Sequence, residues 1–463
     1  MSSDAARVSR ESAEDMGHHL SPSKAYKNYL LTLLMVILAF NFADRMALGI
    51  VLQDIKVDLD LSDTQLGFLT GIAFALFYAV MGVPIARWAD RGNRVAIISI
   101  TASLWSVAVA LCGAATSFFQ LLLIRVGVAV GEAGGVPPAL SLISDYFART
   151  ERARAVARYM LGMQLALLVG YFAAGWWNEL YGWRSTFVIL GVPGLLLAAL
   201  AHFTLREPRR LKVVRGVTAL RVAPVRASSP EPTFKEVCTT LWMNVAFRHL
   251  LFCFSVWYFF GYGVLQWTPA FFIRSYGLAT GELGAWLAAI YGIAGGLGVY
   301  LGGELASRFA AGNERRQLIA CAVAFVIFPA LNAYAFLAPT AHLAFAALAF
   351  ACLGNMAQGP ILATMQTLVP PRMRAMSIAI VYLFANLVGM GLGPLAAGAM
   401  SDALRPWFAE ESLRYALAML CPGYLWAAWH LWRASRTVTH EIAETQAEIG
   451  RDEATPRQWA VAK

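Results

Sequence analysis

The feature that most constrains this chain is the length of its uncharged stretches. Eight stretches of at least 20 residues contain no Asp, Glu, Lys or Arg: 64–86, 95–124, 159–178, 185–205, 249–273, 283–303, 317–371 and 375–401. A helix needs about 20 mostly apolar residues to cross a bilayer. Charged residues make up 14% of the whole chain, against about 25% in a typical soluble protein. The sequence therefore predicts an all-α membrane protein.

Charges and Gly/Pro breaks divide the chain into twelve predicted transmembrane helices. They fall near 28–52, 64–87, 95–115, 118–146, 154–177, 185–205, 246–273, 281–308, 317–338, 341–369, 375–401 and 412–433. Two boundaries lack a charge and depend on a turn, at 114–117 and at 338–340.

The two halves of the chain resemble each other. At a shift of 223 residues Gly131 falls on Gly354 and Pro137 on Pro360, and the run 173–175 falls on 396–398. Each match is weak alone, but the matches share one register across two consecutive helices. This pattern is typical of transporters built from internal repeats. We therefore expect two pseudo-symmetric bundles of six helices.

These patterns predict five regions. They are a cytoplasmic N-terminal tail over 1–27, a six-helix bundle over 28–205, a cytoplasmic linker over 206–244, a second bundle over 245–435 and a cytoplasmic C-terminal tail over 436–463. The linker is basic and contains proline, and it is too polar to cross a bilayer. Its composition allows either disorder or a partly helical, interfacial amphipathic segment.

The distribution of basic residues predicts the orientation. Of 37 Lys and Arg, five fall in loops on one side, two fall within spans, and the other 30 fall on the side of both termini. The positive-inside rule then places both termini in the cytoplasm. The net charge of +9 thus reflects topology and contact with anionic lipid headgroups, and no nucleic-acid partner is expected.

The loop between predicted helices 2 and 3 carries a recognisable motif. It reads from Gly82 to Asp90-Arg91-Gly92-Asn93-Arg94 and resembles the major facilitator signature G-x-x-x-x-x-x-x-D-R-x-G-R, with Gly92 directly after Arg91 and Asn93 between Gly92 and Arg94. We expect Asp90, Arg91 and Arg94 to form a cytoplasmic gate in which Asp90 accepts hydrogen bonds at the start of helix 11. Ordinary positive-inside charge explains the arginines but not an Asp at this position.

Ionisable residues lie within two predicted spans, where they are costly and point to function. Helix 1 carries Asn41, Asp44 and Arg45, with Arg45 about 100° round the helix from Asp44. Helix 4 carries Arg125 and Glu132, seven residues apart and so on one face. A static buried ion network is one interpretation. The other, which we prefer, is proton coupling by Asp44, Arg125 and Glu132.

These residues together support a closer resemblance. The run from Asn41 to Arg94, followed by Arg125 and Gly131-Glu132, resembles bacterial Spinster-type major facilitators. That resemblance implies a bacterial inner-membrane location and export of a lysolipid or a related amphipath. It also implies that Asp44 takes the proton and that Arg125 is its partner, with Glu132 as a second acid. Organic-anion:proton symporters of the same superfamily carry a similar Asn-x-x-Asp-Arg run, and they remain the alternative.

The C-terminal half supplies aromatic and uncharged polar candidates for substrate binding. Together with Asn41 and Arg45 of helix 1, the candidates are Trp257, Tyr258 and Tyr262 of helix 7, Asn355 and Gln358 of helix 10, and Tyr382 and Asn386 of helix 11. An aromatic wall facing a charged wall suits an amphipath with a polar head. For many of these aromatic residues, packing against lipid or the protein core is the competing explanation.

Several classes of function find no support in the sequence. The six cysteines are scattered without a CxxC pair or a histidine at ligand spacing, so we expect free thiols and no metal site. We find no nucleophile triad or phosphate-binding loop, and an enzyme or receptor is disfavoured. We expect a monomeric, proton-coupled transporter without a cofactor, whose partners are membrane lipids and an amphipathic or lysolipid substrate.

Overall fold

The computed structural model describes residues 23–208 and 233–454, and within them every regular element is helical. The elements of the first half are α2 (Lys24–Leu59), α3 (Asp63–Thr70), α4 (Ile72–Arg91), α5 (Arg94–Cys112), α6 (Phe118–Glu132), α7 (Val136–Tyr146), α8 (Arg149–Leu165), η1 (Ala166–Gly170) and α9 (Tyr171–Thr204). Those of the second half are α11 (Phe234–Met243), α12 (Val245–Tyr276), α13 (Thr280–Leu287), η2 (Ala288–Ala294), α14 (Gly295–Phe309), α15 (Glu314–Leu337), α16 (Ala341–Cys352), η3 (Leu353–Ala357), α17 (Gln358–Thr367), α18 (Arg374–Phe384), η4 (Ala385–Leu392), α19 (Gly393–Phe408), η5 (Ala409–Glu411), α20 (Ser412–Leu420), η6 (Cys421–Gly423) and α21 (Tyr424–Ala454).

Local sequence explains where many of these helices begin. Ser62, Asn93, Ser117, Thr233 and Asn244 each precede a helix and accept a hydrogen bond from an N–H of its first turn. Such side chains satisfy N–H groups that have no partner within the helix. The two boundaries predicted from a turn alone are confirmed, because α5 ends before 113 and α16 begins after 340.

The described residues hold ten continuous segments that are long and apolar enough to cross a membrane. Two of them are much longer than one crossing needs, namely Arg154–Thr204 with 51 residues and Met376–Ala447 with 72. The first leaves helical geometry at Gly182, where φ is 76°, and the second at Ala409, where φ is 47°. Both breaks lie where the sequence predicts a loop, so the ten segments accommodate the twelve predicted spans.

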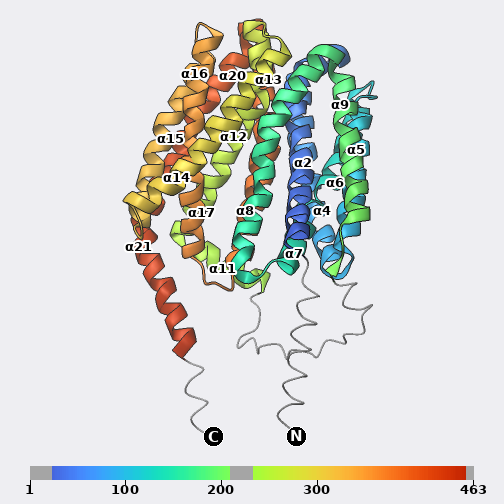
Figure 1. The fold of residues 1–463 in the computed structure, drawn as a ribbon. Helices are drawn as coiled ribbons and strands as arrows, with labels where there is room; N and C mark the ends of the chain where they lie inside the picture. The colour runs from blue at the N-terminus through green and yellow to red at the C-terminus, as the bar shows by residue number, and fades with distance from the viewer. Residues whose placement is uncertain (1–22, 209–232, 455–463) are drawn as a thin grey trace, which may run out of the picture.

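The helices form two bundles side by side, with α2 to α9 in one and α12 to α21 in the other (Figure 1). Helix α2 begins and α21 ends at the same end of the molecule (Figure 1), which we call the termini end. The predicted tail boundary at 435 is not a break in the helix, because α21 continues to Ala454. In the predicted linker, Phe234–Met243 is helical with a capping box, while 209–232 lies outside the described residues.

Breaks within the spans recur in the two halves. The π-helical segment η1 (166–170) falls, at the shift of 223 residues, on 389–393, which overlaps the π-helical η4. The break between α6 and α7 at 133–135 falls likewise at the end of the 3-10 segment η3. Single π turns inside helices are uncommon and concentrate at functional sites. The internal repeat therefore extends to the irregular backbone, which the sequence did not predict.

The two bundles touch most closely at the end opposite the termini, which we call the far end. There α9 packs on α13 and α3 packs on α19. A Cβ at Gly67 would lie 2.5 Å from the Pro394 carbonyl oxygen, and one at Gly175 would lie 2.3 Å from that of Thr280. Only glycine permits the backbones to approach this closely.

Candidate functional site

Asp44 of α2 and Arg125 of α6 form a buried ion pair within their spans. Arg125 Nη1 donates to Asp44 Oδ2 at 2.7 Å, and each side chain is only 2% exposed. The structure thus brings together the two residues that the sequence singled out as partners. A pair this deep is stable only while both charges are present, since one buried charge alone is very costly.

Arg45 and Glu132 form a second buried pair beside the first. Arg45 donates through Nε, at 2.9 Å, and through Nη2 to the same oxygen of Glu132. The 100° turn between neighbours on a helix sends Arg45 to Glu132 while Asp44 faces Arg125. The sequence predicted Arg45 as a substrate-binding residue and Arg125 as the partner of Asp44, with Glu132 as a second acid. The structure instead gives each acid an arginine of its own.

Aromatic rings enclose both guanidinium groups. The Arg45 guanidinium lies 4.5 Å from the ring centre of Phe42, 4.4 Å from that of Phe74 and 5.2 Å from that of Tyr78. Phe74 also lies 5.4 Å from the Arg125 guanidinium. Such contacts stabilise a desolvated cation by about 2 kcal/mol or more. One ring of α4 therefore supports both cations of the site.

These four charged residues, which we call the charge quartet, retain unused hydrogen-bonding capacity. Within the described residues, Asp44 Oδ1, Glu132 Oε1 and Arg125 Nε are buried without a hydrogen-bond partner. Both side-chain amide atoms of Asn41, which is 1% exposed, are likewise buried without a hydrogen-bond partner. Buried polar groups are normally paired. The quartet can therefore accept a proton or a water molecule without first losing an existing bond.

A cavity of 160 Å³ opens beside the charge quartet. Arg45 and Arg125 line it, whereas Asp44 and Glu132 do not. The other lining residues come from both bundles and are mostly apolar: Phe42, Met46, Leu48, Thr70, Phe74, Met163, Gln164, Ala166, Leu167, Tyr262, Leu265, Gln266, Met390 and Pro394. A molecule in this cavity would meet the cations of the quartet, with the carboxylates behind them.

A second cavity of 280 Å³ adjoins the first and lies mainly in the C-terminal bundle. The two share Met163, Gln164, Leu167, Tyr262 and Leu265. Five of the predicted substrate-binding residues line the second cavity: Trp257, Tyr258, Tyr262, Asn355 and Gln358. The cavity lined by the two arginines is therefore adjacent to the cavity lined by the aromatic residues.

Three of the predicted substrate-binding residues lie elsewhere. Asn41 is buried beside the charge quartet and lines neither cavity. Tyr382 and Asn386 also lie outside both linings. Tyr382 instead packs against Tyr258, which lines the second cavity, with 6.5 Å between the two ring centres. Helical position alone could not separate residues that line the cavities from residues that support them.

The predicted gate residues separate in the structure. Arg94 is fully buried and binds Glu207 and Asp145, with 2.7 Å between its Nη2 and the Asp145 carboxylate. Asp145 lies in α7 of the N-terminal bundle and Glu207 lies just after α9, at the start of the predicted linker, so Arg94 joins the linker to that bundle. Arg91 is exposed. The side chain of Asp90 lies outside the described residues, and its gating role stays a prediction.

The far end holds a charge cluster that sequence reasoning missed. Arg274 of α12 donates to both oxygens of Asp63, at 2.7 and 2.8 Å, and Lys56 also binds Asp63. Asp402 of α19 accepts hydrogen bonds from the backbone N–H groups of Asp63 and Thr64 at the start of α3. These contacts join the two bundles, and we call them the far-end network.

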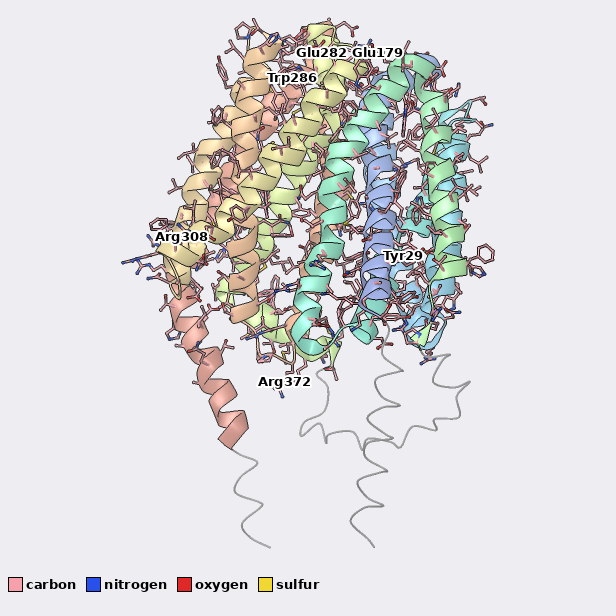
Figure 2. The ribbon with its side chains drawn as sticks, viewed as in Figure 1. Tyr29, Glu179, Glu282, Trp286, Arg308 and Arg372 are labelled. Atoms are coloured by element: carbon pink, nitrogen blue, oxygen red, sulfur yellow. The ribbon has the colours of Figure 1, made fainter. Side chains whose placement is uncertain are left out.

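A further contact between the bundles lies close by. Glu179 of α9 accepts a hydrogen bond of 2.7 Å from the N–H of Gly281 in α13. Figure 2 shows Glu179 and Glu282 at the far end and Arg372 at the termini end. In the sequence, the residues of these contacts appear only as acids or bases at the ends of predicted spans. Such residues usually mark only the boundary of the membrane.

Comparison with known proteins gives consistent results. The model of the Major Facilitator Superfamily matches residues 34–394. An "MFS-type efflux pump" of Mycolicibacterium smegmatis is 32% identical over 409 residues, covering 87% of this chain and 91% of that protein. A crystal structure of a bacterial homolog of the human lysosomal transporter Spinster, inward-facing and unoccupied, matches with a TM-score of 0.79. It is 31% identical and covers 91% of this chain and 99% of that one.

A more distant relative has a different named substrate. A probable galactarate/D-glucarate transporter of Bacillus subtilis is 25% identical over 291 residues, which cover 58% of this chain and 63% of that protein. The similarity thus covers little more than half of either chain.

Proposed function

This chain belongs to the Major Facilitator Superfamily and is a transporter of the Spinster type, and from that premise we propose that it moves an amphipathic, lysolipid-like molecule out of the cell by proton-coupled alternating access. The observation that carries this proposal is the pair of adjoining cavities. One presents two guanidinium groups, and the other presents aromatic and apolar side chains. A polar head and a hydrocarbon tail would each find a suitable surface.

The charge quartet supplies the coupling in this proposal. Two acids and two arginines sum to no net charge, and Asp44 and Glu132 are close enough to interact electrostatically. A proton on one acid relieves the repulsion between the two carboxylates and leaves one arginine without a counter-ion. Arg45 or Arg125 then presents an uncompensated positive charge to the cavity. We propose Asp44 as the principal protonation site, with Glu132 as the second acid.

The charge of the substrate head sets the sign of the coupling. A protonated quartet carries one net positive charge, so an anionic head is favoured together with the proton. A cationic head, or the ammonium of a zwitterion, is disfavoured by the same charge and competes with the proton. Export driven by inward proton flow requires such competition. If a proton changes the affinity for the substrate, the substrate changes the affinity for the proton by the same factor. Either sign of coupling can therefore be measured through substrate binding or through proton binding.

Alternating access in this proposal uses the far-end network as one of two gates. The termini end would lie in the cytoplasm, and closure there by Asp90 would alternate with closure by Asp63, Arg274 and Asp402. The described contacts fit a molecule closed at the far end, as expected for a state that opens toward the cytoplasm. The inward-facing Spinster homolog supports this assignment.

A second candidate function is symport of a small organic anion with a proton. Two observations favour it: the first cavity presents arginines rather than carboxylates, and the Bacillus subtilis relative is a probable galactarate/D-glucarate transporter. The second, aromatic cavity would have no role in binding so small and hydrophilic a molecule.

Transport by reconstituted protein separates the two candidates. The full chain would be placed in proteoliposomes under an imposed pH gradient, with lysophosphatidylethanolamine and galactarate as the test substrates. We expect gradient-dependent movement of the lysolipid, above that in liposomes without protein, and none of galactarate. Movement of galactarate alone would establish the second candidate and overturn the first. Movement of the lysolipid that ignores the gradient would remove proton coupling.

A further inference from the structure

Two glutamines, one from each bundle, reach across the interface beside the first cavity. Gln164 of α8 and Gln266 of α12 both line this cavity together with Arg45. A Cβ at Gly296 of α14 would lie 3.5 Å from Gln164 Oε1, and one at Gly49 of α2 would lie 3.4 Å from Gln266 Nε2. Each amide therefore packs against a glycine of the opposite bundle.

Both amides contain an unsatisfied atom in this state. Within the described residues, Gln164 Oε1 and Gln266 Nε2 are buried and have no hydrogen-bond partner. A buried polar atom without a partner is destabilising. A leucine of similar size would avoid that cost, whereas a donor of a ligand would satisfy Gln164 Oε1 and an acceptor would satisfy Gln266 Nε2.

The place of these amides relative to Arg45 limits what they can bind. Gly49 lies four residues after Arg45 on α2, so the two positions face the same side of that helix. Gln266, which packs over Gly49, therefore lies within one helical turn of the Arg45 position. Gln164 also lines the second, aromatic cavity, so the two glutamines lie where the head and the tail of an amphipath would join.

We infer that Gln164 and Gln266 form a recognition site for a neutral hydrogen-bonding group, such as an amide, that joins the charged head of the substrate to its apolar tail. Gln164 Oε1 accepts from the N–H of that group, and Gln266 Nε2 donates to its carbonyl oxygen. This inference rests on the proposed function and narrows it, because it predicts a preference among amphipaths of equal length and charge. Opening of either gate moves each glutamine away from its opposing glycine, which ties recognition to the conformational cycle.

The test uses two amphipaths that differ in one atom. N-Dodecanoylglycine carries an amide, and dodecanoyloxyacetate carries an ester in its place, so only the first offers an N–H donor. Their KM values would be measured with the full chain in proteoliposomes. Since a hydrogen bond contributes about 0.5 to 1.5 kcal/mol, we expect the wild type to favour the amide by about two- to twelvefold in KM.

The variants distinguish the two glutamines. Gln164→Leu should abolish the preference, because it removes the acceptor for the N–H, whereas Gln164→Glu keeps an acceptor and should retain it even if the leucine variant folds poorly. Gln266→Leu should raise KM for both compounds equally. Gln120→Leu removes a glutamine that is bound to Thr116 away from the cavities and should change neither value.

The possible failures have different meanings. A wild type that moves both compounds with equal KM, or a Gln164→Leu variant that keeps the wild-type preference, would overturn this inference and leave the proposed function intact. A wild type that moves neither compound and no lysolipid would overturn the proposed function, and the inference with it.

Discussion

The charge quartet and the far-end network are built from the same kinds of residue but differ in two respects. The quartet is confined to the N-terminal bundle and contains buried polar atoms without partners. The far-end network joins the two bundles, and both oxygens of Asp63 are bonded, one to Lys56 and Arg274 and the other to Arg274 and Ser401.

This difference indicates what each cluster can do. A satisfied network across an interface holds one conformation and must break when the bundles separate at that end. An incompletely satisfied network within one bundle can survive that movement, and its free oxygens can accept a proton without first losing a hydrogen bond. The quartet is therefore suited to coupling, and the far-end network to gating.

Replacing Asp44 tests the quartet most severely. Asp44→Asn keeps the shape of the side chain but removes its charge and its capacity to exchange a proton. We expect transport driven by a pH gradient to fall to the level of liposomes without protein, with substrate binding largely preserved. The matched control is Asp58→Asn on the same helix, whose side chain is 45% exposed, and it should change transport by less than about twofold. Unchanged proton-driven transport in Asp44→Asn would exclude this residue from the mechanism.

Arg125 tests whether the quartet needs a guanidinium or only a positive charge. Its planar fork can bond to Asp44 while resting on the ring of Phe74, and an ammonium does this poorly. We expect Arg125→Ala and Arg125→Lys both to lower transport by roughly tenfold or more, measured as initial rates in proteoliposomes. Full activity of the lysine variant would leave a simple charge requirement as the explanation.

Arg274 tests whether the far-end network is a gate. Arg274→Gln removes the bidentate bond to Asp63 and leaves Lys56 in place, so we expect the far end to open more often, by at least about tenfold, or roughly 1.4 kcal/mol. A single cysteine at Leu283, which is buried in α13, would be labelled with a membrane-impermeant maleimide.

The control for this experiment is Arg405→Gln, an exposed arginine that pairs with Glu410. Labelling at position 283 should rise in Arg274→Gln and stay at the wild-type level in the control. Equal labelling in both variants would reduce Arg274 to a structural contact.

Asp90 should produce the smallest effect, in the opposite direction. A carboxylate at the start of α18 would gain about 0.3 to 1 kcal/mol from that helix end. Asp90→Asn should therefore shift the population toward the state open at the termini end by about two- to fivefold. Labelling of single cysteines at the termini ends of α6–α7 and α16–α17 would measure the shift. Identical labelling with and without the substitution would remove Asp90 from gating.

Much of this architecture follows directly from the sequence. Uncharged stretches of about 20 residues must be helical in a bilayer, because their backbone polar groups find no other partners there. Ionisable residues within predicted spans, here Asp44, Arg45, Arg125 and Glu132, predict a functional site because burying them is costly. These arguments depend only on local composition and helix periodicity, so they need no knowledge of which helices are neighbours.

The resemblance implied that Arg125 is the partner of Asp44, but only the tertiary structure decided the other contacts of these residues. In the sequence, Asn41, Tyr262, Tyr382 and Asn386 are equal candidates for substrate binding. Of these four, only Tyr262 lines the cavities. It could not show that Arg45 binds Glu132, that Asp402 caps α3, or that Gln164 and Gln266 meet glycines of the opposite bundle. The physical reason is that helix periodicity fixes the direction of a side chain only relative to its own helix, whereas contacts depend on the rotation and depth of two helices packed together.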